Sequence, residues 1–287
     1  MKNVDYPVAL YVVATPIGNL DDISVRAIET LRNVDVIACE DTRNSRVLLN
    51  NWNISTPLMS LHRYNENARI QTVLELLKNG QKVALISDAG TPNISDPGYR
   101  LVCSARDAGF GVVPIPGPSS IVTALSVSGV DGSSFVFMGF SPKKQFALEE
   151  FFRRISLEER TVVFLEPARR ILKSMDVARR LIPNRKFVLN RELTKKFEEI
   201  ISGDAESIYE QLGQRENIKG EFVVVIEPCR LNIEPNIDEI VTELMKAGYS
   251  GKILANEAHI RFNVSKSEAY RKFLSLHRAK TDTEFHS

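Results

Sequence analysis

The sequence has few of the side chains from which metal and covalent catalytic centres are usually built. Its 287 residues include 3 cysteines, 4 histidines and 1 tryptophan. The cysteines, Cys39, Cys103 and Cys229, lie in separate apolar contexts without CxxC spacing. This pattern predicts core thiols in a reducing compartment, without a disulfide scaffold. No cluster of His, Cys and carboxylate residues has zinc-ligand spacing, so we expect no metal site.

Long hydrophobic runs are also missing. The N-terminal apolar run, residues 8–14, is far shorter than the roughly 20 residues that a membrane span needs. Nothing resembling a signal peptide precedes it, so we expect a cytoplasmic protein without a membrane segment. Apolar residues make up 43% and charged residues 25%, which is ordinary for a globular chain, and the length favours two domains.

Several catalytic and nucleotide-binding motifs are absent. No GxGxxG follows the first apolar run, and no GxxxxGK[ST] occurs, which disfavours a classical dinucleotide fold and a P-loop. Among the histidines only His62 lies in the part that alternates strands and helices, so neither a Ser-His-Asp nor a Cys-His set can be assembled. Hydrolysis by covalent catalysis is therefore disfavoured.

The formal net charge of +1 hides a segregation of charge along the chain. Residues 141–200 carry 15 Lys and Arg against 9 Asp and Glu, and residues 246–280 carry 8 against 2. Residues 201–245 between them carry 3 against 10. Clustered cations favour a polyanion partner through release of phosphate counterions. The alternative is that these segments are solvated helix faces with intramolecular partners.

The first 116 residues alternate short apolar runs with helical patterns. Such runs, separated by helices, predict a buried and mostly parallel sheet. We expect Asp22 to cap the first helix, and Gly80 to end the helix over residues 68–79. The expected strands are 9–14, 34–38, 58–61, 83–86 and 112–115, and the expected helices include 68–79 and 99–108.

Prolines and a glycine at residues 114–118 mark the clearest break in the chain, and the predicted domains are residues 1–117, 118–230 and 231–287. The second domain reads as α/β with a mixed sheet, and residues 227–236 read as a linker. The last domain reads as three short helices, the third opened by a capping box over residues 265–268. This bundle either binds nucleic acid or packs as an appendage that aids dimerisation. The expected strands of the second domain are 135–137, 161–165, 187–189 and 222–226, and its expected helices are 119–128, 145–155, 168–181 and 204–212.

Three loops that follow predicted strands are rich in turn-forming and small polar residues: 15–20, 87–98 and 116–120. In open α/β sheets ligands bind at the carboxyl ends of the strands. Loops of this composition expose backbone N–H and C=O groups and let a ligand approach the main chain. Three of them at one sheet edge predict a small-molecule cleft.

These loops carry a resemblance to a known family. Residues 14–20 (ATPIGNL), 40–43 (EDTR) with Ser45 and Arg46, 60–62 (SLH) and 87–98 (SDAGTPNISDPG) resemble one branch of the tetrapyrrole methylase superfamily. So do residues 116–120 (PGPSS), 191–195 (RELTK) and 219–221 (KGE). That branch methylates the 2′-hydroxyl of cytidine 1402 in bacterial 16S rRNA. The match runs in order from about residue 9 to 228.

The resemblance implies a two-domain, tetrapyrrole-methylase-like (class III) methyltransferase fold of α/β class with a small C-terminal helical bundle. It also implies a homodimer, S-adenosyl-L-methionine as cofactor, and 16S rRNA in the small ribosomal subunit as partner. The family's run with Tyr and His appears here as residues 164–170 (FLEPARR), so roles of those two side chains do not carry over. The implied cofactor-binding residues are Pro16, Ile17, Gly18, Asn19, Ser87, Asp88, Ala89, Gly90, Thr91, Ile94, Ser95, Ser119, Ser120, Phe164 and Leu165.

Methyl transfer from a sulfonium is an in-line displacement, so alignment and exclusion of water supply much of the catalysis. A base, or a cation that stabilises developing alkoxide, would assist a ribose hydroxyl. Asp88 could instead orient a turn, residues 40–43 could be a helix start, and His62 is favoured as structural rather than as a base. The catalytic candidates are Glu40, Asp41, Arg43, Asp88, Glu166 and Arg191.

With the resemblance in view, the basic segment 141–200 predicts an rRNA-binding surface. We expect charge reversal at Lys143, Lys144 and Arg153 to weaken RNA binding without changing cofactor affinity. Three other functions stay open: a methylase of a tetrapyrrole ring, a non-catalytic RNA-binding assembly factor, and a DNA-binding regulator using the C-terminal helices. The expected RNA-binding residues are Arg46, Lys143, Lys144, Arg153, Arg169 and Arg170, with Arg43, Arg154, Arg179 and Arg180 as further members of the basic surface.

Overall fold

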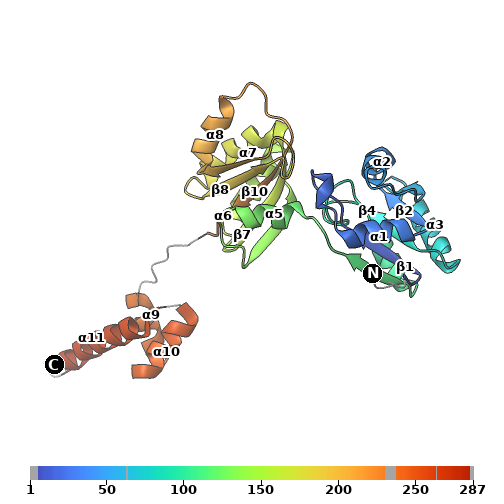
Figure 1. The fold of residues 1–287 in the computed structure, drawn as a ribbon. Coiled ribbons are helices and arrows are strands. Elements are labelled where there is room, and N and C mark those ends of the chain that lie inside the picture. The colour runs from blue at the N-terminus through green and yellow to red at the C-terminus, as the bar shows by residue number, and fades with distance from the viewer. Residues whose placement is uncertain (1–5, 63, 230–236, 263, 285–287) are drawn as a thin grey trace. The chain divides into compact units, whose positions relative to one another are not determined.

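The computed structural model describes residues 6–62, 64–229, 237–262 and 264–284 of the chain. Contacts divide the chain into two units, Met1–Cys229 and Arg230–Ser287. The first unit holds two five-stranded sheets and the second is helical (Figure 1). Most of the predicted linker, residues 230–236, lies outside the described residues. No helix in the described part is long and apolar enough to cross a membrane.

The first sheet has the strand order β3-β2-β4-β1-β5 and every pairing in it is parallel. This confirms the predicted parallel sheet, and β1 and β4 are almost entirely buried because helices cover both faces. Since β1 lies between β4 and β5, the loops after these three strands are neighbours at one edge. The strands are β1 (Ala9–Val13), β2 (Val36–Cys39), β3 (Leu58–Ser60), β4 (Val83–Ile86) and β5 (Gly111–Ile115).

Helices α1 and α2 cover one face of this sheet and α3 and α4 cover the other. The predicted cap of α1 is wrong by two residues. Asp22 ends a short 3-10 helix (Leu20–Asp22), and the Ser24 hydroxyl accepts the Ala27 N–H at 3.1 Å to cap α1 instead. Gly80 has φ +78° and follows the end of α3, as predicted. The helices are α1 (Val25–Asn33), α2 (Thr42–Asn51), α3 (Glu66–Lys78) and α4 (Tyr99–Asp107).

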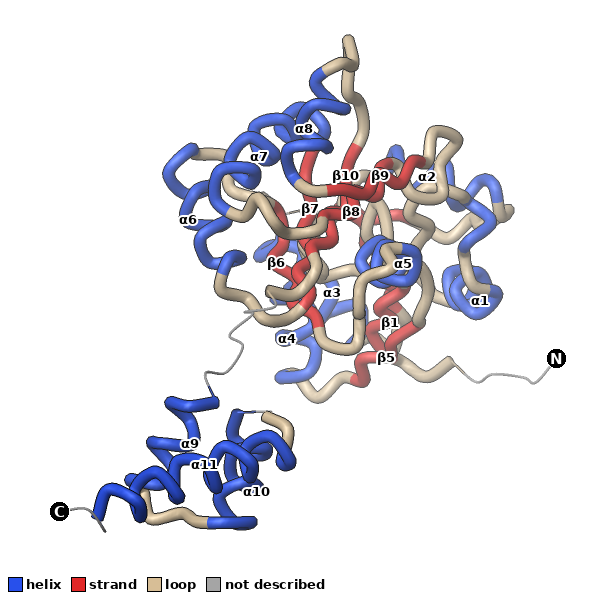
Figure 2. The backbone as a smooth tube through the Cα atoms, turned by 90° about the vertical axis from the view of Figure 1, so that its left-hand side faces the viewer, coloured by secondary structure: helices blue, strands red, loops and turns tan. Residues whose placement is uncertain are grey.

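The second sheet has the order β6-β7-β10-β8-β9 and is mixed, as predicted: β6 and β7 are parallel and the other pairs antiparallel. Its edge strand β9 was not predicted, because only two apolar residues, Ile200 and Ile201, stand in it. Helices α6, α7 and α8 cover one face and α5 covers the other (Figure 2). The strands are β6 (Phe135–Phe140), β7 (Thr161–Pro167), β8 (Phe187–Arg191), β9 (Glu199–Gly203) and β10 (Glu221–Ile226), and the helices are α5 (Ser120–Val127), α6 (Gln145–Ser156), α7 (Ala168–Leu181) and α8 (Ala205–Gly213).

The second unit consists of the three predicted helices, α9 (Ile237–Lys246), α10 (Gly251–Phe262) and α11 (Lys266–Glu284). They share a core of their own in which Val241, Leu254 and Ala269 are fully buried. Lys272 Nζ lies 2.7 Å from Asp238 Oδ1 and joins α11 to α9. Helix α11 begins where the capping box was predicted, with Ser265 Oγ 2.8 Å from Ser267 Oγ.

Candidate active site

The loops after β1 and β4 are tied together at the carboxyl edge of the first sheet. Thr15 and Gly90 exchange two backbone hydrogen bonds of 2.9 and 3.0 Å, and the buried Thr15 hydroxyl donates to the Ser87 carbonyl at 3.0 Å. The Thr91 hydroxyl reaches the Pro118 carbonyl in the loop after β5 at 3.4 Å. The three loops predicted from their composition therefore form one connected structure.

A fourth loop, which follows β8, lies against the loop after β1. The Asn19 N–H donates to Thr194 Oγ1 at 3.0 Å. A Cβ on Gly18 would lie 2.5 Å from Lys195 Cγ and 2.7 Å from the Leu193 carbonyl oxygen. A side chain at residue 18 is therefore incompatible with this approach, which explains why glycine stands there.

Backbone strain is concentrated in two of these loops. Among the described residues, five that are not glycine have positive φ, and four of them lie here. Asn93 and Ser95 (φ 74° and 70°) follow β4, and Glu192 and Thr194 (φ 49° and 64°) follow β8. Each left-handed residue costs about 1–2 kcal/mol, and such strain persists where the surroundings hold it and often marks a functional site.

The loops enclose a cleft of about 340 Å³. Five carboxylates line it against one lysine, and Lys195 Nζ pairs with Glu192 at 3.0 Å. A cleft of this charge favours a cationic ligand and repels phosphate. The lining residues are Ile17, Glu40, Asp88, Ala89, Ile94, Ser95, Asp96, Ser120, Phe140, Leu165, Asn190, Glu192, Leu193, Lys195, Glu221 and Val223.

A second hollow of about 400 Å³ adjoins the cleft, because Glu40 and Asp88 line both. Its other walls come from the start of α2 and the end of β3, including Arg43 and His62. The Tyr64 N–H donates to His62 Nδ1 at 3.3 Å, which leaves Nε2 as the ring nitrogen available to a ligand. The hollow thus combines carboxylate acceptors with N–H donors.

Asp88 holds the start of α2 in place. Its Oδ1 accepts the Asp41 N–H at 3.2 Å, and its Oδ2 accepts from the Asn44 side chain at 2.9 Å. Residues 40–43 are indeed a helix start: the Asp41 carboxylate accepts the Arg43 N–H at 2.8 Å and also pairs with its guanidinium. These bonds from Arg43 lower the pKa of Asp41 from 3.8 to about 2. Buried nearby, the Cys39 thiol has its pKa raised by desolvation.

The structure brings eight of the sequence-predicted site residues to the lining of the cleft: Ile17, Glu40, Asp88, Ala89, Ile94, Ser95, Ser120 and Leu165. Arg43 lines the adjoining hollow. Pro16, Gly18, Asn19, Ser87, Gly90, Thr91 and Ser119 belong to the loops around the cleft without lining it, and several of them hold those loops together.

Three predicted site residues are placed elsewhere. Phe164 is fully buried and packs edge-to-face on Phe151, because neighbours on a strand point to opposite faces and Leu165 takes the cleft side. Glu166 is also fully buried; it accepts from the Ser174 hydroxyl at 2.5 Å and pairs with Arg170 at 3.0 Å. Arg191 donates to the Lys219 carbonyl at 2.9 Å instead of lining the cleft.

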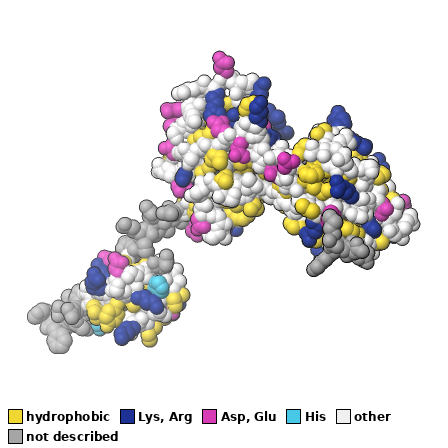
Figure 3. Space-filling model, in the orientation of Figure 1, with side chains coloured by type: hydrophobic (Ala, Val, Ile, Leu, Met, Phe, Trp, Pro, Cys, Tyr) yellow, Lys and Arg dark blue, Asp and Glu magenta, His cyan; other side chains and the backbone are white. Residues whose placement is uncertain are grey.

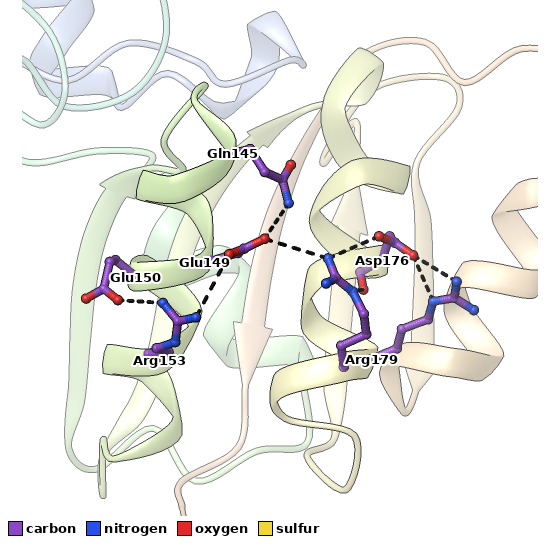
Figure 4. A network of polar contacts seen from close by, with 7 residues as sticks. Gln145, Glu149, Glu150, Arg153, Asp176 and Arg179 are labelled. Carbon is purple, nitrogen blue, oxygen red and sulfur yellow. Dashed lines mark hydrogen bonds and ion pairs between the residues drawn. The ribbon is translucent and has the colours of Figure 1, made fainter.

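Many of the arginines predicted to bind RNA have intramolecular partners. Arg153 lies 2.6 Å from Glu150, and Arg179 lies 2.8 Å from Asp176, within a network that joins α6 to α7 (Figure 4). Arg170 belongs to the buried pair with Glu166. On the part of the chain that carries the second sheet, Lys and Arg side chains are accordingly interspersed with Asp and Glu (Figure 3).

Of the cations predicted to bind RNA in the basic segment, four form no ion pair among the described residues: Lys143, Lys144, Arg154 and Arg169. All four are exposed, as is Arg46 on α2. Lys143 and Lys144 follow Phe140, which lines the cleft. The structure therefore narrows the predicted basic surface to a few free side chains, two of them close in sequence to the cleft.

Sequence reasoning missed the contribution of β8 and β10 to the cleft. Asn190 and Val223 line it from these strands, and Glu221 lies at the start of β10. The available signals were the family-like runs at residues 191–195 and 219–221, which adjoin β8 and the start of β10, and Asn190 itself, which follows the apolar residues 187–189. Among the described residues, no cluster of three or more His, Cys, Asp or Glu could hold a metal ion.

Comparison with known proteins agrees with this architecture. Residues 9–209 match the family described as Tetrapyrrole (Corrin/Porphyrin) Methylases. The uroporphyrin-III C-methyltransferase of Thermus thermophilus, solved with S-adenosyl homocysteine, aligns with a TM-score of 0.56 at 16% identity, covering 76% of this chain and 96% of that one. This likeness confirms the predicted fold.

Curated relatives are much closer in sequence. The protein named ribosomal RNA small subunit methyltransferase I of Pasteurella multocida is 45% identical over 240 residues, 83% of this chain and 84% of its own. Its namesake from Mesorhizobium japonicum is 42% identical over 271 residues, 93% of this chain and 92% of its own. The chain therefore belongs to the tetrapyrrole methylase family, within the group of ribosomal RNA small subunit methyltransferase I proteins.

Proposed function

We propose that this methyltransferase transfers the methyl group of S-adenosyl-L-methionine to the ribose 2′-hydroxyl of a cytidine, position 1402, in the 16S rRNA of the small ribosomal subunit. The observation that carries the proposal is the pair of adjoining cavities, an acidic cleft and a polar hollow that share Glu40 and Asp88. The relatives' names support an rRNA substrate.

The residues of the cleft fit the cofactor. S-adenosylmethionine, when bound, supplies an electrophilic methyl group on a positively charged sulfur. The carboxylates of Glu40, Asp88 and Asp96 stabilise a cation. Leu165 and Val223 offer apolar surface from the second sheet.

We place the target nucleotide in the adjoining hollow. Cytosine presents one amino donor and two acceptors on its pairing edge, and the hollow offers carboxylates together with N–H donors from Arg43 and His62. A nucleotide there brings its ribose toward Glu40 and Asp88, where the two cavities meet. Asp88 positions α2, and Glu40 is the carboxylate best placed to accept the hydroxyl proton.

The substrate must approach the acidic cleft through cations that are free to bind phosphate. Lys143 and Lys144 are exposed, and Arg46 lies on the exposed side of α2. We assign RNA contact to these three and to Arg169. Glu166 and Arg170 are assigned instead to holding the loop after β6, because Arg170 also donates to the Ser141 carbonyl at 3.1 Å.

We further propose that the chain acts in the cytoplasm as a homodimer. Exposed apolar side chains on α5 and β6 support self-association, with Val122 60% and Phe135 40% exposed. Light scattering on the purified chain tests this proposal: a single species of twice the chain mass is expected, and a monomer at micromolar concentration would contradict it.

A methyl-transfer assay tests the function. Purified chain and S-adenosylmethionine labelled on its methyl group are incubated with small subunits lacking the modification, and the labelled nucleoside is identified. Label in 2′-O-methylcytidine is expected. Label on the base, or none on either subunits or free 16S rRNA, would contradict the proposal; transfer to a tetrapyrrole would then identify the ring-methylase alternative.

A further inference from the structure

The part of the cleft contributed by the second sheet is a single cross-strand row. Val223 on β10 is paired with Leu165 on β7 and with Asn190 on β8. Side chains of directly paired residues lie on the same face of a sheet. All three residues line the cleft. The row therefore presents two apolar side chains and one amide.

The amide of Asn190 is fixed in one orientation. Its Nδ2 donates to the Val223 carbonyl at 3.1 Å and lies 3.4 Å from the Val188 carbonyl, so Oδ1 is the acceptor left over. The residue is fully buried, and Oδ1 has no hydrogen-bond partner in the described structure. A buried acceptor without a donor costs about 1–3 kcal/mol, so a donor from a bound molecule would be strongly favoured here.

The ligand group that carries this donor must itself be largely apolar. Leu165 and Val223 flank the amide, so the ligand group that carries the N–H or O–H has to pack against aliphatic side chains. Of the donors on S-adenosylmethionine, the α-ammonium is charged and the ribose hydroxyls sit on a polar sugar, so both are better served by the carboxylates. The 6-amino group of adenine is a neutral donor on the edge of a flat ring with apolar faces.

The orientation of the cofactor agrees with this choice. The reacting methyl must point to the hollow, where Glu40 and Asp88 line both cavities. Those residues belong to loops of the first sheet, whereas Leu165, Val223 and Asn190 belong to the second. A molecule whose sulfonium lies by Glu40 and Asp88 extends its adenosine toward the opposite wall.

We propose that Asn190 is the residue that selects the adenine ring: Oδ1 accepts the 6-amino group while Leu165 and Val223 pack against the ring. This inference rests on the cofactor assigned in the proposed function. It makes Asn190 a specificity-determining residue, distinct from the loop residues that shape the cleft.

The test compares S-adenosylhomocysteine with S-inosylhomocysteine, in which an oxo group replaces the 6-amino group. Binding of each is measured by calorimetry to the full chain and to Asn190→Leu. The full chain should prefer the adenosyl ligand by about 10-fold or more, since an acceptor then faces an acceptor. Asn190→Leu should bind both ligands within about threefold of each other, a loss of selectivity that general weakening of the cleft cannot produce.

Val223→Ala is the matched control, because it trims the apolar row and leaves both side-chain amide atoms in place. Val223→Ala should lower the affinity for both ligands by the same factor and retain the preference for the adenosyl ligand. If Asn190→Leu does not fold, Asn190→Ala, which also removes Oδ1 but adds no bulk, replaces it in the same comparison.

Equal binding of both ligands to the unaltered chain would overturn this inference and leave the cofactor assignment standing; Oδ1 would then be satisfied by a buried water. Retained selectivity in folded Asn190→Leu would also overturn it. Failure of S-adenosylhomocysteine to bind at all would overturn the cofactor assignment and this inference together.

Discussion

The N–H of Asn19 and the hydroxyl oxygen of Thr194, 175 residues apart in sequence, form a 3.0 Å hydrogen bond that joins the first loop of the cleft to the loop after β8. Gly18 makes this contact possible, because a Cβ there would lie 2.7 Å from that same Thr194 oxygen. The two loops belong to different sheets, so the shape of the cleft depends on their contact.

Gly18→Ala should therefore damage the cleft. Overpacking costs about 1–3 kcal/mol, and the strain is relieved when the loops separate. We expect the affinity for S-adenosylhomocysteine to fall about 10-fold or more, as measured by calorimetry, while the midpoint of thermal unfolding changes little. Gly213→Ala is the control: nothing lies within 4 Å of a Cβ there, and the residue ends α8. Unchanged affinity in Gly18→Ala would show that the loops do not need this approach.

Arg169 and Arg170 are neighbours with opposite environments, and their alanine variants should behave differently. Arg170 lies 3.0 Å from the fully buried Glu166, so its removal leaves a buried charge unpaired. Breaking such a pair costs about 3–5 kcal/mol. Urea unfolding should show that loss for Arg170→Ala and a change within about 0.5 kcal/mol for the exposed Arg169→Ala. Similar stability of the two variants would contradict the ion pair.

The stability of the folded chain should depend on pH through Asp41, which caps the start of α2. Its pKa is lowered to about 2 in the folded chain from 3.8, so the unfolded chain binds the proton more tightly. The charged form thus contributes to stability above about pH 4, and the contribution is lost as pH falls toward 2. Asp41→Asn keeps a capping oxygen and loses the charge. Its deficit in urea midpoint should shrink between pH 6 and pH 3; a constant deficit would exclude a role of the charge.

The order of elements and the loops of the first sheet were readable from the sequence because both depend on local signals. A buried parallel strand shows as an apolar run, and a ligand loop shows as a cluster of small polar residues. Asp41 and Asp88 were recognised as polar residues at strand ends. Their bond to each other depends on which strands are adjacent, and that order is not visible in the residues alone.

The second half of the site was less predictable for a physical reason. Phe164 and Leu165 are both apolar, and only the packing of α6 and α7 decides which of the two faces the core. Glu166 was predicted as a catalytic candidate because it is acidic, yet inside the fold it accepts a hydrogen bond from Ser174 and pairs with Arg170. Asn190 was overlooked because a single polar residue directly after the apolar residues 187–189 carries no spacing pattern.

RNA affinity should depend on Lys143 and Lys144 together. Both are exposed and unpaired in the described structure, unlike Arg153, whose reversal would also disturb its pair with Glu150. The logarithm of RNA affinity falls as the logarithm of salt concentration rises. Replacing both lysines by alanine should make that negative slope shallower by about 1–2 for a single-stranded target. Cofactor affinity should stay unchanged.

Lys78→Ala, at the end of α3, is the control and should leave the RNA slope unaltered. Filter binding of 16S rRNA at several salt concentrations measures the slopes. Equal slopes in the double variant and the unaltered chain would remove these lysines from the RNA surface, as would a parallel loss of cofactor affinity.

Glu40 should carry the proton transfer, because it lines both the cleft and the hollow and directly follows β2. Glu40→Gln retains the size of the side chain and removes its basicity, so kcat should fall about 100-fold or more while S-adenosylhomocysteine affinity changes less than threefold. His62→Asn tests the histidine as the alternative base. We expect its kcat to change little, since His62 Nδ1 already accepts the Tyr64 N–H. If His62→Asn abolished turnover and Glu40→Gln did not, the base would be the histidine.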